Sequence, residues 1–175
     1  MLRRLLVPAS LLPLVLQAPA QAAGVGYALP SFRVLTVGQA LSLGASVQVI
    51  GTTFQISDVA AQAGLDYAYT RDFSASTNYA FFDLTVGAGV PLGFTPQFYV
   101  TPALDLHSLF FVSSPENLNT PAFGIAPRLS FGFRPARALA IELGLSQAFL
   151  LNLASKSQPH SGGLTTVQLS GTYSF

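Results

Sequence analysis

The chain has 175 residues, of which 9% are charged and 50% hydrophobic, with eight Lys and Arg against seven Asp and Glu. A soluble domain carries about 25% charged residues, so this composition favours an apolar environment around the protein. The balanced charge and the lack of any Lys/Arg-rich run exclude a nucleic-acid partner, and the lack of cysteine excludes disulfides, thiolate metal sites and a cysteine-linked lipid anchor.

The first 22 residues have the three parts of a secretory signal peptide. Arg3 and Arg4 precede an apolar run over residues 5–16, and the Ala-Gln-Ala of residues 20–22 is typical of a cleavage site. The run is shorter than the roughly 20 apolar residues of a transmembrane helix, and two prolines interrupt it. We therefore predict a signal peptide over 1–22, cleaved after Ala22, and a single exported domain over 23–175.

The exported part predicts an all-β protein. It has no apolar stretch of 18 residues, and without helices only a closed barrel satisfies all backbone hydrogen bonds in lipid. Apolar and polar residues alternate with the period of two of a β-strand, which predicts an eight-stranded antiparallel up-and-down transmembrane barrel. The second choice of fold is a secreted soluble β-sandwich. In chain order the predicted strands lie within Val25–Val37, Leu41–Ile50, Val59–Thr70, Asn78–Val90, Phe94–Phe111, Phe123–Arg134, Leu139–Leu151 and Thr166–Phe175.

Connection lengths predict the orientation of the barrel. Outer-membrane barrels have short periplasmic turns and longer external loops, and their even strand number places both termini on the periplasmic side. This assigns Val112–Pro121 and Leu153–Ser161 to the outside, and Pro91–Gly93 and the turn at Pro135 to the periplasm. The segment Gly51–Asp58 is longer than this rule favours for a periplasmic connection.

Charged residues provide an independent test of the two faces, because Lys or Arg on the lipid face at mid-membrane costs about 2–4 kcal/mol. When faces are assigned from apolar residues alone, every ionisable residue in the seven clearer strands points into the lumen. We predict a polar cluster there, in which Arg128 is paired with two carboxylates on either side, Asp105 and Glu142. The inward residues are Asp66, Asp83, Asp105, His107, Arg128, Arg134 and Glu142.

Three residues fit this register poorly. Arg33 points outward in the simplest alignment of the first strand. Pro102 and Pro127 cannot donate to a β-ladder, so a bulge is expected at each.

The large aromatic residues are expected on the outer face, where they would form belts at the two membrane interfaces. Ordinary strand-forming residues would share this face without clustering by depth. These residues are Tyr67, Tyr69, Phe82, Phe123, Phe133, Tyr173 and Phe175.

The end of the chain resembles that of the small bacterial outer-membrane barrels, such as the membrane domain of OmpA and the OmpX and OmpW groups. Val167, Leu169, Tyr173 and Phe175 match the terminal strand of these proteins, and Gly171 departs from it where a larger apolar residue is common. The resemblance implies an outer-membrane location, contact with outer-membrane lipid, and recognition of this strand by the barrel-assembly machinery. It selects no family and implies no activity.

An eight-stranded barrel is about wide enough for its own side chains to fill, so the lumen is interpreted first as a structural polar core in a non-enzymatic envelope protein. A narrow solute channel is the main alternative. A lipid-modifying enzyme is weaker, because His107 and Ser108 are neighbours in a strand and point to opposite faces. The polar external segments are too short to favour a large protein receptor, and His160 is too isolated for a metal site. We predict no catalytic residue, metal or cofactor, and the oligomeric state is open.

Overall fold

The structure is a computed structural model that describes residues 24–56, 58–115, 118, 120–153 and 161–174. The predicted signal peptide and Phe175 lie outside the described residues. The strands are β1 (Gly24–Ala28), β2 (Ser31–Val37), β3 (Ala40–Ile56), β4 (Val59–Asp72), β5 (Thr77–Gly89), β6 (Leu92–Gly93), β7 (Phe98–Ser113), β8 (Ala122–Ala136), β9 (Leu139–Leu150) and β10 (Gly162–Ser174).

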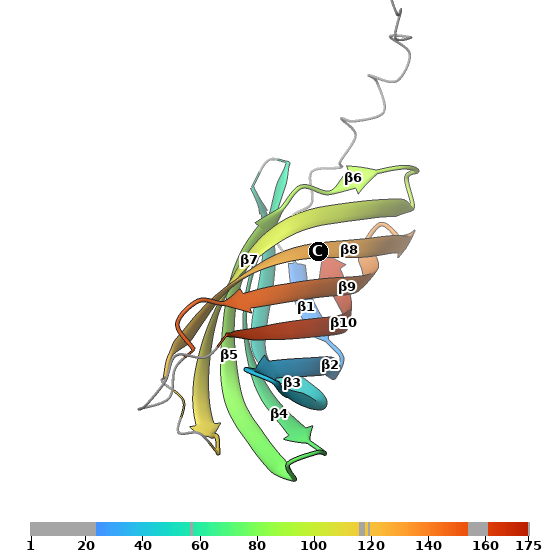
Figure 1. Cartoon of the computed structure of the whole chain (residues 1–175). Helices are drawn as coiled ribbons and strands as arrows, with labels where there is room; N and C mark the ends of the chain where they lie inside the picture. Colours follow the sequence, from blue (N-terminus) through green and yellow to red (C-terminus); the bar gives the residue numbers. More distant parts are fainter. Residues whose placement is uncertain (1–23, 57, 116–117, 119, 154–160, 175) are drawn as a thin grey trace, which may run out of the picture.

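The strands form one closed antiparallel barrel (Figure 1). From β2 to β9, each long strand pairs with the next long strand along the chain, and the pairing of β9 with β10 and of β10 with β1 and β2 closes the ring. Segments β1 and β2 form one barrel strand, because both lie between β10 and β3, and β6 only adds two residues beside β7. The eight-stranded barrel predicted from the alternation is therefore confirmed. In the described part of the chain, no helix is long and apolar enough to cross a membrane.

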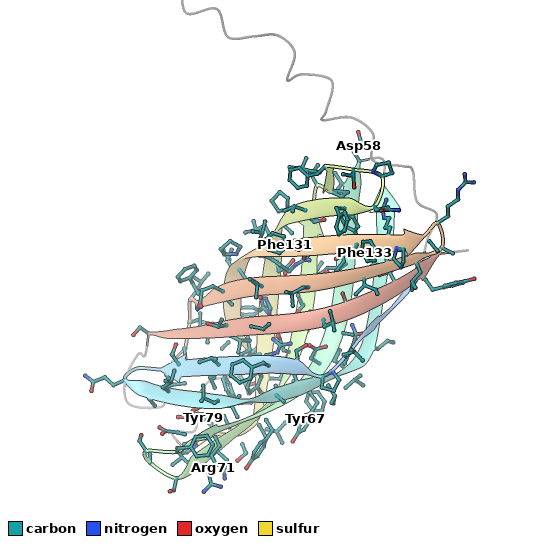
Figure 2. All side chains as sticks on the ribbon, turned by 90° about the vertical axis from the view of Figure 1, so that its right-hand side faces the viewer. Asp58, Tyr67, Arg71, Tyr79, Phe131 and Phe133 are labelled. Atoms are coloured by element: carbon teal, nitrogen blue, oxygen red, sulfur yellow. The ribbon has the colours of Figure 1, made fainter. Side chains whose placement is uncertain are left out.

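The two ends of the barrel differ in their connections. One end carries the start of β1, the end of β10 and the connections 57–58, 90–97 and 137–138; we call it the terminal end. The other, the loop end, carries the connections 38–39, 73–76, 114–121 and 151–161. Asp58 and Arg71 mark these two ends in Figure 2.

A break between β1 and β2 changes the register, and it overturns the outward placement of Arg33. Ala28 pairs with Ser170, but Phe32 pairs with Val167, so the first strand gains one residue relative to β10 at Leu29–Pro30. One extra residue exchanges the two faces of a strand. Phe32 is consequently exposed and Arg33 is buried in the lumen.

The expected bulges at the two prolines are also wrong. Pairing of β7 with β8 runs through Pro102 and Pro127 without a register shift. Pro102 is tolerated because it lies opposite the gap between the ends of β5 and β6, where the ladder is interrupted. Pro127 is tolerated because the β8–β9 ladder stops at Ile125 and resumes at Arg128 in the same register.

The segment Gly51–Asp58 is not a long connection. Strand β3 continues to Ile56, which pairs with Val59 at the start of β4. The alternation was hard to follow because β3 gains one residue relative to β4 at Val49. Val49 and Ile50 are both exposed, as a bulge at this point requires.

The outer face is apolar, and its aromatic residues gather at two depths. Towards the loop end, Tyr67, Phe82 and Phe110 are directly paired across β4, β5 and β7. Towards the terminal end, Phe98 stacks on Phe133 with ring centroids 4.8 Å apart. This clustering favours membrane-interface belts over scattered strand-forming residues. All the predicted outward aromatics that the structure describes are exposed, namely Tyr67, Tyr69, Phe82, Phe123, Phe133 and Tyr173.

Candidate functional site: the lumen of the barrel

The loop end of the lumen is filled by apolar side chains, which we call the apolar plug. Tyr79 and Phe81 project inward from β5 and are fully buried. The ring of Phe81 packs against that of Phe111, with the two ring centroids 5.5 Å apart. Leu118 and Leu153 enter the plug from the two longer connections at this end. The plug consists of Leu35, Val37, Ala68, Tyr79, Phe81, Leu109, Leu118, Ala122, Ala126, Ala148, Leu150, Leu153 and Leu164.

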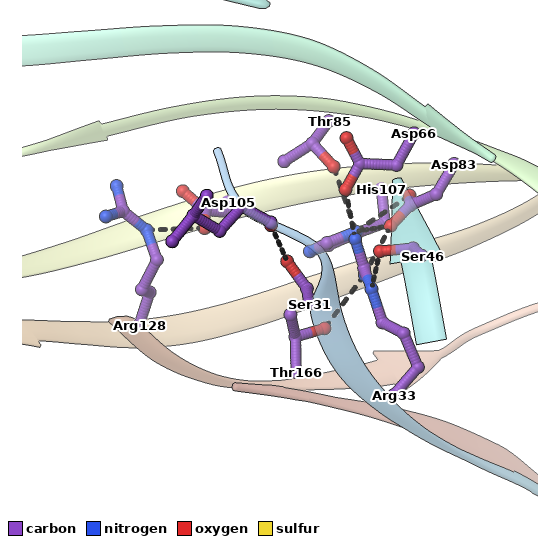
Figure 3. Close-up of polar contacts among 11 residues, drawn as sticks. Ser31, Arg33, Ser46, Asp66, Asp83, Thr85, Asp105, His107, Arg128 and Thr166 are labelled. Carbon is purple, nitrogen blue, oxygen red and sulfur yellow. Dashed lines mark hydrogen bonds and ion pairs between the residues drawn. The ribbon is translucent and has the colours of Figure 1, made fainter. Parts of the chain in front are cut away.

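On the terminal side of the plug lies a charged cluster centred on Arg33, whose side chain is only 2% exposed (Figure 3). Its guanidinium forms ion pairs with Asp66 and with Asp83, the latter at 2.9 Å. It also donates to Ser46 at 2.9 Å and to Thr166 at 2.8 Å. Four barrel strands besides β2 therefore meet on one side chain. Such a charge is tolerated in a dry interior because it is paired on several sides.

His107 completes the Arg33 cluster. Its Nδ1 lies 2.9 Å from Asp83 and 3.3 Å from Thr85. Its Nε2 is buried and has no hydrogen-bond partner among the described groups. Ser108 lies on the opposite face of β7, so these two neighbours do not form a nucleophile–base pair. Within the described residues, no group of three or more His, Cys, Asp or Glu side chains is arranged to hold a metal ion.

Arg128 forms a second, separate pair nearer the terminal end. Its Nε donates to Asp105 at 2.8 Å and its Nη1 to Ser130 at 2.7 Å. The expected second carboxylate, Glu142, is not its partner. Glu142 pairs with Gly132, four residues along β8 from Arg128, which places the two side chains at different depths.

Glu142 belongs to a third group. It accepts a hydrogen bond of 2.5 Å from the hydroxyl of Tyr99. The guanidinium of Arg134 lies over the ring of Tyr99, 4.5 Å from its centroid. Gly132 makes this arrangement possible, because a Cβ there would lie 2.1 Å from the Tyr99 ring.

The terminal half of the lumen contains a cavity of about 150 Å³. Small inward residues on β4 and β9, including Ala60, Gly64 and Gly144, leave this space open. Its charged lining consists of three arginines, three carboxylates and one histidine, so the positive and negative side chains are nearly balanced. These are Arg33, Arg128, Arg134, Asp66, Asp105, Glu142 and His107.

All seven ionisable residues that were predicted to point inward line the lumen or are buried in it, but they divide into the three groups described above. Asp66, Asp83 and His107 join Arg33, which the sequence register had placed outside. Tyr99 was not identified as a lumen residue, although its alternation with Thr101 and Asp105 could have indicated it. The apolar plug was missed because inward apolar residues were not distinguished from lapses in the pattern.

Val167, Leu169 and Tyr173, the described residues of the resemblance at the chain end, lie on the outer face of β10. Leu169 and Tyr173 are exposed and Val167 is half-buried beside Phe32. Gly171 lies in open space, since its nearest neighbour to an added Cβ is a backbone oxygen 3.9 Å away. Gln147, a polar residue on the outer face of β9, is hydrogen-bonded to Thr165 of β10.

The fold is similar to those of solved small outer-membrane barrels. Neisserial surface protein A matches with a TM-score of 0.56 at 13% identity, over 87% of this chain and 96% of the other. Ail, the attachment invasion locus protein of Yersinia pestis, matches with a TM-score of 0.53 at 15% identity, over 89% of this chain and 99% of Ail. A second Ail structure, in complex with the heparin analogue sucrose octasulfate, has a TM-score of 0.54 at 12% identity, over 87% and 97% of the two chains. No protein-family model and no curated protein matches the sequence.

These similarities concern the fold. Together with the closed eight-stranded barrel and its apolar outer face, they define the class: the chain has the fold of the small bacterial outer-membrane β-barrel proteins. The comparisons select no single family within this class.

Proposed function

We propose that the protein is an integral, non-enzymatic outer-membrane barrel that conducts neither ions nor solutes. The single observation that carries this proposal is the apolar plug at the loop end of the lumen. A constriction lined by buried apolar side chains excludes hydrated ions, and the charged groups beneath it are held in pairs. The barrel then acts as a rigid membrane-embedded element of the envelope.

The proposed orientation places the loop end outside the cell and the terminal end in the periplasm. The longer connections at the loop end support this assignment, as does the position of both termini at the other end. In this proposal residues 1–22 are removed on export. Val167, Leu169 and Tyr173 of the last strand, together with Phe175, form the signal for the barrel-assembly machinery.

A heat-modifiability gel followed by planar-bilayer recording tests the proposal. The folded protein is expected to migrate differently before and after boiling, and to give no current steps in the bilayer. Failure to form a heat-modifiable species would contradict the barrel in the membrane. Regular current steps from the folded protein would contradict the closed lumen.

A narrow channel is the second candidate, and the observation that favours it is the polar cavity in the terminal half. The variant Arg128→Ala separates the two functions, because Arg128 lines the cavity and is paired with Asp105. A structural role predicts lower thermal stability and an unchanged baseline current. A change in single-channel current would favour the channel.

A further inference from the structure

The barrel wall has a seam between β1 and β3 in its terminal half. These strands pair at Gly24 with Thr53, and pairing resumes only at Ser31 with Ser46. Both pairs have the same register, so six positions on each side, residues 25–30 and 47–52, face one another without ladder pairing in the described backbone. Every other neighbouring pair of long strands is paired continuously or with much shorter interruptions.

A side chain replaces the backbone pairing at this seam. The N–H of Leu29 bonds to β10, so alternation turns the N–H of Ala28 towards β3. There it donates to Oε1 of Gln48 at 2.8 Å. Gly51 keeps room for this side chain, since a Cβ at that position would lie 1.9 Å from Nε2 of Gln48. Gln48 therefore spans the seam with one side-chain hydrogen bond to the backbone of β1.

The seam separates two different environments. On its inner side, Ala28, Gln48 and Thr52 line the cavity. On its outer side, Leu29, Val47 and Ile50 are 56%, 50% and 68% exposed and belong to the apolar face. Unpaired backbone groups in contact with hydrocarbon are costly, so a polar occupant that reaches this seam from the cavity would be stabilised there.

The charges of the cavity indicate what kind of occupant fits. Near the terminal end, the lining includes Arg128, which is paired with Asp105, and Arg134 and Glu142, which both contact Tyr99. This part of the cavity therefore holds two positive and two negative groups. A purely anionic or cationic ligand would meet like charges, whereas a zwitterion can satisfy both signs. The apolar residues outside the seam provide a path for attached acyl chains.

We propose that the cavity and seam form a binding site for the zwitterionic headgroup of a membrane phospholipid, with its acyl chains passing between β1 and β3 into the bilayer. The site rests on the proposed function, because it requires the barrel to be in a membrane. The phosphate would face the two arginines and the ammonium group the carboxylate of Glu142. Gln48 would control entry from the bilayer.

Native mass spectrometry of the folded full-length protein in dodecyl maltoside tests the site. The probe is dioleoyl phosphatidylethanolamine, compared with dioleoyl phosphatidylglycerol and with water-soluble glycerophosphoethanolamine. We expect one phosphatidylethanolamine per chain, bound at least tenfold more tightly than either comparison ligand. Equal binding of the glycerol lipid, or of the headgroup without chains, would overturn the proposal, as would a folded barrel that retains no lipid.

Two variants make the test specific. Glu142→Gln is expected to weaken phosphatidylethanolamine binding about tenfold, whereas Asp58→Asn, an exposed carboxylate at the same end, should leave it unchanged. Gln48→Ala should speed exchange of the bound lipid for its deuterated form at least fivefold. Equal effects of the two carboxylate variants, or unaltered exchange in Gln48→Ala, would contradict the site. The heat-modifiability gel is run on every sample, so that failure to form a barrel is distinguished from failure to bind lipid.

Discussion

The two halves of the lumen are built on opposite principles within the same strands. On β5, Tyr79 and Phe81 belong to the apolar plug, whereas Asp83, two residues further along the same face, belongs to the Arg33 cluster. On β2, the inward residue Leu35 belongs to the apolar plug, and the next inward residue, Arg33, is the centre of the charged cluster. The loop half is therefore filled by bulky apolar side chains, whereas the terminal half contains a cavity lined by charged side chains.

The difference shows how a narrow barrel can combine a filled end with an end that contains a cavity. Bulky side chains fill the loop half as they fill the core of a soluble protein. In the terminal half, small residues such as Ala60 and Gly64 leave space, and ion pairs hold the surrounding walls. The Arg33 cluster lies at the boundary between the two halves and links five strands. The stability of the barrel should therefore depend most strongly on this cluster.

Arg33→Ala is expected to have the largest effect, because it leaves Asp66 and Asp83 buried without their cation. Removing one partner of a buried pair costs about 3–5 kcal/mol. Urea unfolding in detergent micelles, followed by the heat-modifiability gel, measures the loss. Arg137→Ala is the control, because Arg137 is exposed in a turn at the terminal end. If both variants were equally stable, the boundary cluster would not be a structural element.

Phe81→Ala tests the loop half and is expected to lower the unfolding free energy by about 3 kcal/mol. Phe81 is fully buried in the plug, so its truncation creates a cavity that the rigid barrel cannot collapse. Phe131→Ala is the matched control, since Phe131 is 48% exposed on the outer face of β8 (Figure 2). A larger loss in the control would show that the outer belt, not the plug, stabilises the barrel.

The outer face of this barrel could be predicted from the sequence because lipid accepts one kind of side chain, and that rule repeats at every second residue. The inner face follows no such rule. Both Phe81 and Asp83 are suitable inside, one packed and the other paired, so alternation alone cannot divide the lumen into a plug and a cavity. The size of the inward residues distinguishes the two halves, because these residues are large towards the loop end and small towards the terminal end.

The ionisable residues of the lumen were predicted to point inward, except Arg33, but the pairings among them were not predicted correctly. Single-residue shifts at Leu29–Pro30 and at Val49 change which residues face each other, and nothing local in the sequence distinguishes them from ordinary lapses. Arg33 was misplaced for this reason. Glu142 was assigned to Arg128 because the offset between neighbouring strands depends on pairings across the whole barrel.

Leu153→Ala probes the contribution of a connection to the plug. Leu153 is 1% exposed although it lies outside the strands, whereas Leu151, two residues earlier, is 67% exposed. We expect a loss of about 2 kcal/mol, at the lower end of the range for buried leucines because a connection can relax more than a strand. Leu151→Ala should change stability much less. Equal losses in urea unfolding would mean that the connection does not pack into the plug as a specific element.

Gly171→Ala is expected to have the smallest effect, and it is the one substitution that should stabilise. Glycine in a strand interior costs roughly 0.5–1 kcal/mol relative to alanine, and at Gly171 an added Cβ meets nothing closer than 3.9 Å. Gly132→Ala provides the contrast, because its Cβ would lie 2.1 Å from the Tyr99 ring and displace it from the polar half of the lumen. Urea midpoints should therefore move in opposite directions for the two variants. A shift in the same direction would show that strand propensity, and not the space beside each glycine, governs these positions.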